Sequence, residues 1–308
     1  MRSSERIAIK IALILLAVGA VTAFAAAEVV GFDFSELVQS GYEPHGYYMS
    51  GDGIDSISVD AYDCDIRFAA SDDGMCQVVC PENNKITHTV EVNDGTLEIK
   101  RVDNRKWYER IGFFINIIGP KEIIVYLPGS TYESLRAASV SGDITIPAGF
   151  SFASAALSST SGDIKCNAAV NGSVSVATVS GDIEISCGDC ENMNVASTSG
   201  DITVTDAALS GEFRAKAISG NVTLQFVTAS DSINIETVSG NVRLGVVDAE
   251  TLDIVTTSGN VTGTIKTGKT FTTDTVSGRI DVPVSASGGK CKIKTTSGNI
   301  KIGIASAE

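Results

Sequence analysis

A Ser-Gly corner recurs through most of this chain at intervals of 19 or 20 residues. A fixed period of this size predicts a repeat architecture, in which each repeat stacks on its neighbours and shares a core with them. A uniform stack offers regular faces and few clefts, which favours a binding surface, scaffold or spacer over an enzyme. The nine corner glycines are Gly142, Gly162, Gly181, Gly200, Gly220, Gly240, Gly259, Gly278 and Gly298.

Apolar and polar residues alternate on both sides of every corner. The positions seven and five residues before each glycine are almost all apolar, and the position two residues after it is always Ile or Val. A period of two predicts two short strands joined at the corner, and no helical periodicity is present. We therefore expect an all-β, single-domain β-solenoid of about ten coils of 19–20 residues, with two strands in each coil. Right-handed winding is the default for such a chain.

The residues around each glycine are suited to a tight bend. Glycine permits positive φ and has no Cβ to collide with the coil above. The next residue is Asp in four copies, Asn in four and Arg in one, Arg279; Asp and Asn cap turns by bonding their own backbone. Ser or Thr stands three residues before the glycine in every copy except that of Ala217. Such a row of hydroxyls can satisfy backbone groups that the bend leaves unpaired.

Four segments follow from this pattern. Residues 1–27 are a membrane anchor or signal segment, 28–53 a juxtamembrane stalk, 54–134 irregular N-terminal coils and a cap, and 135–308 the regular solenoid. An imperfect coil starts near Ile57 and has Cys64 in place of glycine. A strand–turn–strand pattern surrounds the turn at 93–95, and 123–127 form a further strand. The aromatic stretch 107–118 is interpreted as a cover for the end of the core, or else as a membrane or partner contact.

The N-terminal segment determines the expected location. Arg2, Arg6 and Lys10 precede an apolar run at 11–27, and acidic residues follow it. This order places the N-terminus inside the cell and the solenoid outside, on a single uncleaved span at the cell membrane. The tyrosines at 42, 47 and 48 would then rest at the membrane interface. Cleavage near Ala27 and secretion is the alternative.

Charge narrows the range of partners. The chain has 37 acidic and 23 basic residues, a net charge of −14, which repels nucleic acid and favours cations or basic partners. Four lysines nevertheless crowd the last repeat. We interpret them as protection of an open sheet edge, with an anionic partner or end-on docking as alternatives. They are Lys290, Lys292, Lys294 and Lys301.

The cysteines are interpreted separately. Cys166, Cys187 and Cys291 occupy core positions and are expected to be buried hydrophobes. Cys187 and Cys190 also have a CxxC spacing, which leaves a local disulfide or a metal open as alternatives. The pair at 76 and 80 is expected to be able to form a disulfide outside the cell.

Two motifs suggest a cofactor. Gly263, Gly268, Lys269 and Thr270 match a phosphate-binding loop, but that chemistry needs a helix after the loop, and here the next solenoid strand follows. We interpret the match as chance and expect no cofactor. Four consecutive corners carry a carboxylate, and we interpret them as turn caps, with a calcium ladder as the alternative. These residues are Asp143, Asp163, Asp182 and Asp201.

Signals of an enzyme are nearly absent. The two histidines, His45 and His88, lie outside the repeats, and no nucleophile elbow, zinc motif or dinucleotide fingerprint is found. Coils that differ in length by one residue leave no long loops to wall a cleft. We therefore assign no catalytic residue.

The runs Val-Ser-Gly-Asp-Ile at 140–144 and 179–183 and Val-Ser-Gly-Asn-Val at 238–242 resemble a bacterial family of adhesin-like proteins, a domain of unknown function. The resemblance covers about residues 54–304 and implies a surface-exposed β-solenoid, in some members linked to envelope stress. We expect a non-catalytic, membrane-anchored extracytoplasmic domain for adhesion or envelope scaffolding, with an unknown protein or glycan ligand. The alternatives are an envelope-stress sensor or regulator that binds a peptide or membrane protein and, third, a polysaccharide-active enzyme.

Overall fold

The structure, a computed structural model, describes residues 41–106, 121–284 and 288–305. The predicted anchor at 1–27, the first part of the predicted stalk and the aromatic stretch 107–118 lie outside these residues. Within the described ranges, no helix is long and apolar enough to cross a membrane. The description below concerns the all-β unit that contains residues 42–104 and the chain from 121 onward.

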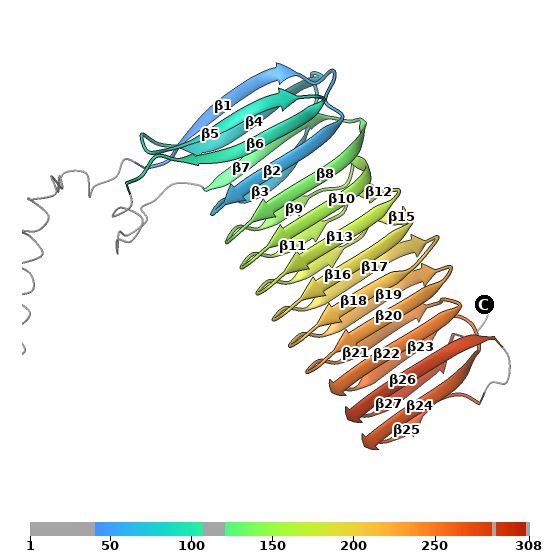
Figure 1. Ribbon diagram of the computed structural model, residues 1–308. Coiled ribbons are helices and arrows are strands. Elements are labelled where there is room, and N and C mark those ends of the chain that lie inside the picture. Colours follow the sequence, from blue (N-terminus) through green and yellow to red (C-terminus); the bar gives the residue numbers. More distant parts are fainter. Residues whose placement is uncertain (1–40, 107–120, 285–287, 306–308) are drawn as a thin grey trace, which may run out of the picture. The chain divides into compact units, whose positions relative to one another are not determined.

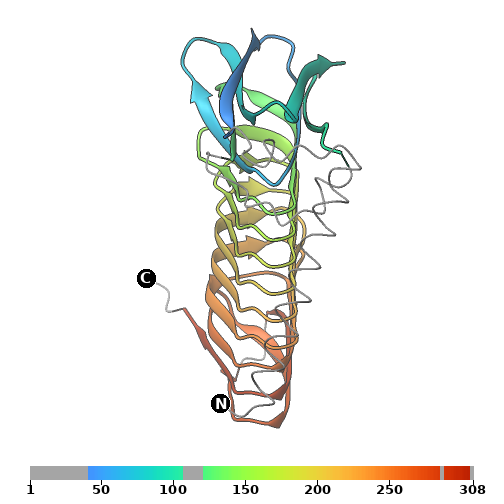
Figure 2. The same cartoon turned by 90° about the vertical axis from the view of Figure 1, so that its left-hand side faces the viewer.

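Two long sheets form opposite walls of a solenoid (Figures 1 and 2). Most neighbouring strands are parallel, and each coil contributes one strand to each sheet. Sheet A contains, in spatial order, β1 (Glu43–Ser50), β4 (Met75–Glu82), β7 (Glu122–Pro128), β3 (Asp65–Ser71), β9 (Ile144–Ile146), β11 (Ile164–Cys166), β14 (Ile183–Ile185), β17 (Ile202–Leu209), β19 (Val222–Ala229), β21 (Val242–Val247), β23 (Val261–Ile265), β27 (Ile300–Ile304) and β25 (Ile280–Asp281), with β15 (Gly188–Cys190) beside β17.

Sheet B forms the second wall and carries the strands that precede each corner. In spatial order from the opposite end, it contains β24 (Lys269–Ser277), β26 (Gly289–Ser297), β22 (Thr251–Ser258), β20 (Ser232–Thr237), β18 (Phe213–Ala217), β16 (Asn192–Ser197), β13 (Ser173–Thr178), β10 (Ser151–Ser159), β8 (Thr131–Ser139), β2 (Ser56–Tyr62), β6 (Thr96–Asp103) and β5 (Ile86–Asn93), with β12 (Ala169–Val170) beside β10. The predicted all-β solenoid of ten two-strand coils is confirmed.

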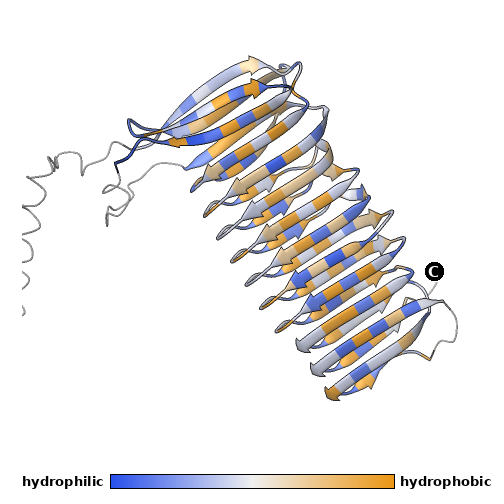
Figure 3. Ribbon diagram, viewed as in Figure 1, coloured by the Kyte–Doolittle hydropathy of each residue, from blue (hydrophilic) through white to orange (hydrophobic). Residues whose placement is uncertain are grey.

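Apolar and polar residues alternate along most strands (Figure 3), and the apolar ones form one continuous buried core between the sheets. In one representative coil, Ile233 and Ile235 of β20 face Val242 and Leu244 of β21, and all four are buried. Each buried aliphatic side chain contributes roughly 1.5–3 kcal/mol relative to exposure. The predicted two-residue alternation is therefore what holds successive coils together.

Close packing explains the corner glycines better than backbone conformation does. A Cβ on Gly220 would overlap the carbonyl oxygen of Gly200 one coil away, and the same overlap recurs at the other corners. None of the nine corner glycines has positive φ, so the expectation of a left-handed corner is wrong. Stacked backbones approach too closely here for any side chain.

The row of hydroxyls satisfies the backbone as expected. Ser159 Oγ donates to the carbonyl of Gly142 at 3.2 Å, and Thr237 Oγ1 donates to that of Gly220 at 3.4 Å. Equivalent bonds link Thr178, Ser197, Thr256, Thr275 and Thr295 to the neighbouring corner. The prediction that these side chains pair the carbonyl groups at the bend is confirmed.

At both ends of the solenoid the coils lie out of sequence order. The last coil of the chain, β26 with β27, lies between β22/β23 and β24/β25, so the penultimate repeat forms the end of the stack. At the other end, β6 and β7 lie nearer the end of the stack than β2 and β3, although they follow them in the sequence. The expectation that the lysine-rich repeat protects the open edge is therefore wrong.

Charge pairing accounts for the order at the C-terminal end. Lys292 Nζ lies 2.8 Å from Asp253 Oδ2 on the inner neighbour, and Lys294 is in register with Asp274 on the outer one. If β24 followed β22 directly, Asp253 would lie beside Thr272 and would have no cation next to it. Placing the lysine-rich coil between the two acidic coils removes that cost.

An antiparallel cap closes the N-terminal end. β1 pairs antiparallel with β4, and Tyr47 donates to Glu82 Oε1 at 2.7 Å. The prediction of a stalk is therefore wrong for residues 43–50, and Tyr47 is bonded within the cap. β5 and β6 form the expected hairpin, with positive φ at both turn residues, Asp94 and Gly95.

All seven cysteines are buried free thiols. Cys166, Cys187 and Cys291 lie in the core as predicted. Cys76 and Cys80 are four residues apart on one strand, which separates their Cα atoms by about 13 Å. The predicted disulfide between these two residues is therefore wrong.

Candidate functional site

The residues that follow the corner glycines form a single hydrogen-bonded column, here named the corner ladder. From Asp143 onward, each backbone N–H in the ladder donates to the side-chain Oδ1 of the neighbouring coil at 2.7–3.0 Å. The expectation that these side chains cap their own backbone is wrong, because they cap the next coil. In spatial order the ladder is Asp65, Asp143, Asp163, Asp182, Asp201, Asn221, Asn241, Asn260, Asn299 and Arg279.

The ladder changes character along the stack. Five carboxylates at its N-terminal end give way to four amides, whose Nδ2 groups also donate to the preceding Oδ1 at 3.1–3.2 Å. Arg279 comes last, and no further described coil needs an acceptor from it. The acidic potential of the corner therefore ends before the C-terminal coils.

The four aspartates proposed as an alternative calcium site do not converge. Each offers one carboxylate oxygen to the next backbone N–H, and the carboxylates are spread along the stack. The described part of the chain contains no group of three or more His, Cys, Asp or Glu residues that could hold a metal ion. The calcium ladder stays a prediction.

The residues of the phosphate-loop match lie on two solenoid strands. Gly263 is within β23, and Lys269 and Thr270 begin β24 with Gly268 just before them. The Lys269 ammonium is buried and lies 2.7 Å from Asp248 Oδ1. This lysine therefore neutralises a carboxylate of its own chain, and a strand follows where phosphate binding requires a helix.

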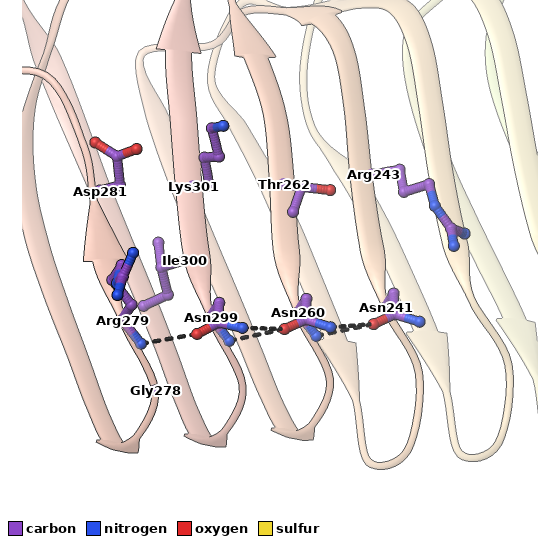
Figure 4. A pocket seen from close by; sticks show the side chains of 10 residues that line it. All are labelled: Asn241, Arg243, Asn260, Thr262, Gly278, Arg279, Asp281, Asn299, Ile300 and Lys301. Atoms are coloured by element: carbon purple, nitrogen blue, oxygen red, sulfur yellow. Dashed lines mark hydrogen bonds between the residues drawn. The ribbon is translucent and has the colours of Figure 1, made fainter.

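An open polar groove lies beside the amide half of the ladder (Figure 4). We name it the C-terminal groove. Figure 4 shows the stacked amides along one side and a row of outward side chains from neighbouring strands along the other. Its lining residues are Asn241, Arg243, Asn260, Thr262, Gly278, Arg279, Asp281, Asn299, Ile300 and Lys301.

Three cations and one carboxylate set the charge of this groove. Arg243, Thr262, Lys301 and Asp281 occupy one register position on four successive strands, so Arg243 and Lys301 are about 10 Å apart. Among the described residues, neither of them nor Arg279 forms an ion pair, although both arginines are exposed. The groove is thus a local cationic site on an acidic protein.

A second groove runs along the sheet B side of the corner. Part of its wall is a column of β-branched residues two positions before successive corner glycines, of which Ile218 and Val238 are each about half exposed. We name this column the aliphatic ridge. The position holds Val, Ile or Thr in every copy, so the sequence indicates this column. The predictions from the sequence use only the alternating positions that face inward, and they therefore do not include this column.

The C-terminal groove was also missed by reasoning from sequence. The lysines of the last repeat indicated the region, but Arg243 belongs to a repeat that is not its neighbour in sequence order. The exchange of the last two coils places Lys301 two strands from Arg243 instead of three and leaves Arg279 at the end of the stack. The usable signal was the single arginine in a column of Asp and Asn.

A stack of ten two-strand coils with this corner defines a bacterial-type β-solenoid repeat domain without a preformed deep site among the described residues. The chain belongs to the Toastrack DUF4097 family, whose model matches residues 54–303. No curated protein matches it.

Several solved structures are similar in arrangement. A "putative adhesin" from Bacteroides fragilis is 16% identical with a TM-score of 0.41, and 85% of this chain matches 97% of that one. A "putative lipid binding protein" from Parabacteroides distasonis is 17% identical with a TM-score of 0.41, over 86% and 97%. A "putative cell adhesion protein" from Clostridium sporogenes is 10% identical with a TM-score of 0.26, over 86% and 100%.

Proposed function

We propose that this protein is a non-catalytic, membrane-anchored extracytoplasmic solenoid that binds an anionic ligand at its C-terminal groove, in adhesion or envelope scaffolding. The observation that carries the proposal is a group of three cations, Arg243, Arg279 and Lys301, that form no ion pair with any described residue, on a chain of net charge −14. Several other exposed cations of sheets A and B pair with acids, as Lys165 does with Glu184. Arg136, Lys290 and Lys294 form no ion pair with a described residue either, but they do not line this groove. Cations that are left unpaired on an acidic protein are available to a ligand.

The chemistry of the groove favours a polyhydroxylated acid. Guanidinium groups bind carboxylate or phosphate through paired hydrogen bonds, while the amides of Asn241, Asn260 and Asn299 supply further polar groups along the same wall. An acidic glycan combines both features, because it presents anionic groups between hydroxyls. We therefore propose an acidic envelope or host glycan as the ligand.

The position of the groove suits presentation away from a membrane. β1, which follows the N-terminal segment, is at one end of sheet A, and β25 and β27 are at the other. Twelve strand spacings separate the ends, about 60 Å. With the predicted anchor at residues 1–27, the solenoid would hold its cationic end at this distance from the point where the chain enters the stack.

The test uses the full-length chain in detergent micelles on arrays of carboxylated, phosphorylated and neutral glycans. The triple variant Arg243→Ala, Arg279→Ala, Lys301→Ala should weaken binding to acidic glycans by about tenfold or more, a loss of roughly 1.4 kcal/mol. The control triple Lys100→Ala, Arg214→Ala, Lys216→Ala changes the net charge equally but removes cations that pair with acids within the chain. Binding there should stay nearly unchanged.

Equal losses in both triple variants would contradict a site at the groove and indicate a general charge effect. If the protein binds no glycan on the array but binds one defined membrane protein, the adhesion role is contradicted and the role of envelope sensor or regulator is favoured. Turnover of a glycan that one acidic substitution abolishes would overturn the non-catalytic role. Each outcome is read on the same array and in the same detergent.

A further inference from the structure

The C-terminal end of the stack exposes positions that are buried in every other regular coil. Ile280 is 42% exposed, whereas its equivalents on the two coils beneath, Ile300 and Val261, are fully buried. Phe271 and Val282 are only partly buried, although they face the core. No described residue covers this end, so the core stops at an unfinished surface.

The strand that forms this surface is well suited to pair with another strand. β24 has nine residues and pairs on one side only, with β26, which leaves its outer edge unpaired in sheet B. Natural edges are protected by outward charges or proline. Here Asp274 is the only outward charge, because the Lys269 ammonium is buried against Asp248. In sheet A the short edge strand β25 is followed by Pro283, which limits pairing there.

The corner ladder excludes a further coil of the same kind as the occupant. Every coil added in parallel receives an acceptor from the preceding Asp or Asn, and Arg279 offers none. The partner must therefore approach in the opposite direction. The N-terminal end shows the same solution within the chain, because its outermost strands, β1 and β5, are antiparallel to β4 and β6.

We propose that two copies of this chain associate C-terminal end to C-terminal end, with β24 antiparallel to the β24 of the partner subunit about a two-fold axis at Thr273. In this register Thr272 faces the partner's Asp274 and Phe271 faces the partner's Thr275, so the inner faces meet and no like charges are opposed. The two Arg279 corners lie at opposite edges. The sequence of β24 is thus complementary to itself.

This dimer has a consequence that rests on the proposed function. The N-terminal ends of the two stacks would lie about 120 Å apart, twice the span of one stack. With the predicted anchor, the two chains would belong to facing membranes, and the contact would itself be adhesive. The dimer can be tested without this assumption.

The first test is a cross-link in the full-length chain. Thr273→Cys places two thiols opposite each other on the axis, where Cβ atoms are about 4.5–5.5 Å apart, and mild oxidation should give a covalent dimer on a non-reducing gel. Thr270→Cys is the matched control, because the same register places its two thiols far apart. The native cysteines are buried in each chain. Absence of the Thr273→Cys dimer, or equal cross-linking of both variants, would overturn the inference.

The second test measures association by sedimentation in detergent. Thr273→Lys opposes two ammonium groups on the axis and should raise the dimer Kd by about tenfold or more, whereas Thr272→Lys faces the partner's Asp274 and should not weaken it. Both side chains are at least partly exposed in one chain, so both variants should fold. A parent chain that remains monomeric contradicts the dimer and leaves glycan binding intact. A dimer that fails to link proteoliposomes contradicts the anchoring only.

Discussion

The backbone N–H of Asn299 donates a 2.8 Å hydrogen bond to Oδ1 of Asn260, across 39 residues of sequence. The repeat that lies between them in sequence has Arg279 at its corner. The backbone N–H of Arg279 donates to Asn299 Oδ1 at 2.8 Å, so this repeat lies on the other side of Asn299. These two bonds fix the order of the last three coils. Arg279 is the one corner residue whose side chain cannot accept a hydrogen bond, and it lies at the end of the stack, where no further described coil needs an acceptor.

The first prediction tests that role. Asn260→Ala removes the acceptor for Asn299 and leaves a backbone N–H without its partner, so the free energy of unfolding should fall by about 1 kcal/mol. Arg279→Ala should leave stability within about 0.5 kcal/mol, because its side chain supports no neighbouring coil. Urea unfolding of both variants measures the difference. Equal losses of unfolding free energy in the two variants would contradict the position of Arg279 at the end of the ladder.

The second prediction concerns the corner glycine. Gly220→Ala adds a methyl group that overlaps the backbone carbonyl of Gly200, and neither backbone can move without breaking its neighbours' pairing. We expect a loss of about 3 kcal/mol or more. Gly129→Ala is the control, because its Cβ would meet no atom within 4 Å; it should be neutral or slightly stabilising. Similar melting temperatures for the two variants would contradict close packing as the reason for glycine.

The third prediction is a pH dependence from the N-terminal cap. His88 is buried, and its ring nitrogens have no hydrogen-bond partner among the described residues. Burial lowers the pKa of its imidazole despite Glu82, whose Oε1 lies 3.4 Å from Nδ1. Arg101 lowers the pKa further, and Asp63 opposes that shift. The folded state therefore keeps the ring neutral, while the unfolded chain takes up a proton below about pH 6.5.

Stability should thus be fully present above about pH 6.5 and fall as the pH drops below it, at up to about 1.4 kcal/mol per pH unit. His88→Phe should flatten the unfolding free energy between about pH 6.5 and pH 5.5, above the range of ordinary carboxylates. His45→Gln removes the chain's only other histidine and should keep the slope. An unchanged slope in His88→Phe would assign the effect to other groups.

The sequence was sufficient for the coils but not for their order. Alternation around Gly240, with Ile235 before it and Val242 after it, specified two strands and an inward face, because burial depends on a local period. The exchange of the last two coils places Lys292 beside Asp253, a pairing that no local pattern encodes. The groove was hard to predict for a related reason, since the exchange places Lys301 two strands from Arg243 instead of three.

The last prediction concerns a column of residues with strained backbone, which their residue types do not indicate. Asp206, Phe226 and Val246 stand six residues after three successive corner glycines, and all three have positive φ, at 51°, 54° and 58°. Asp tolerates this conformation, whereas a β-branched side chain is an outlier there and costs of order 1–3 kcal/mol. Val246 is only partly buried, so little packing is lost on replacement. Val246→Asn should therefore raise the free energy of unfolding by about 1 kcal/mol, measured by urea denaturation, and Val255→Asn, on an exposed position of β22 without positive φ, should not. A destabilised Val246→Asn would mean that its side-chain contacts outweigh the relief of backbone strain.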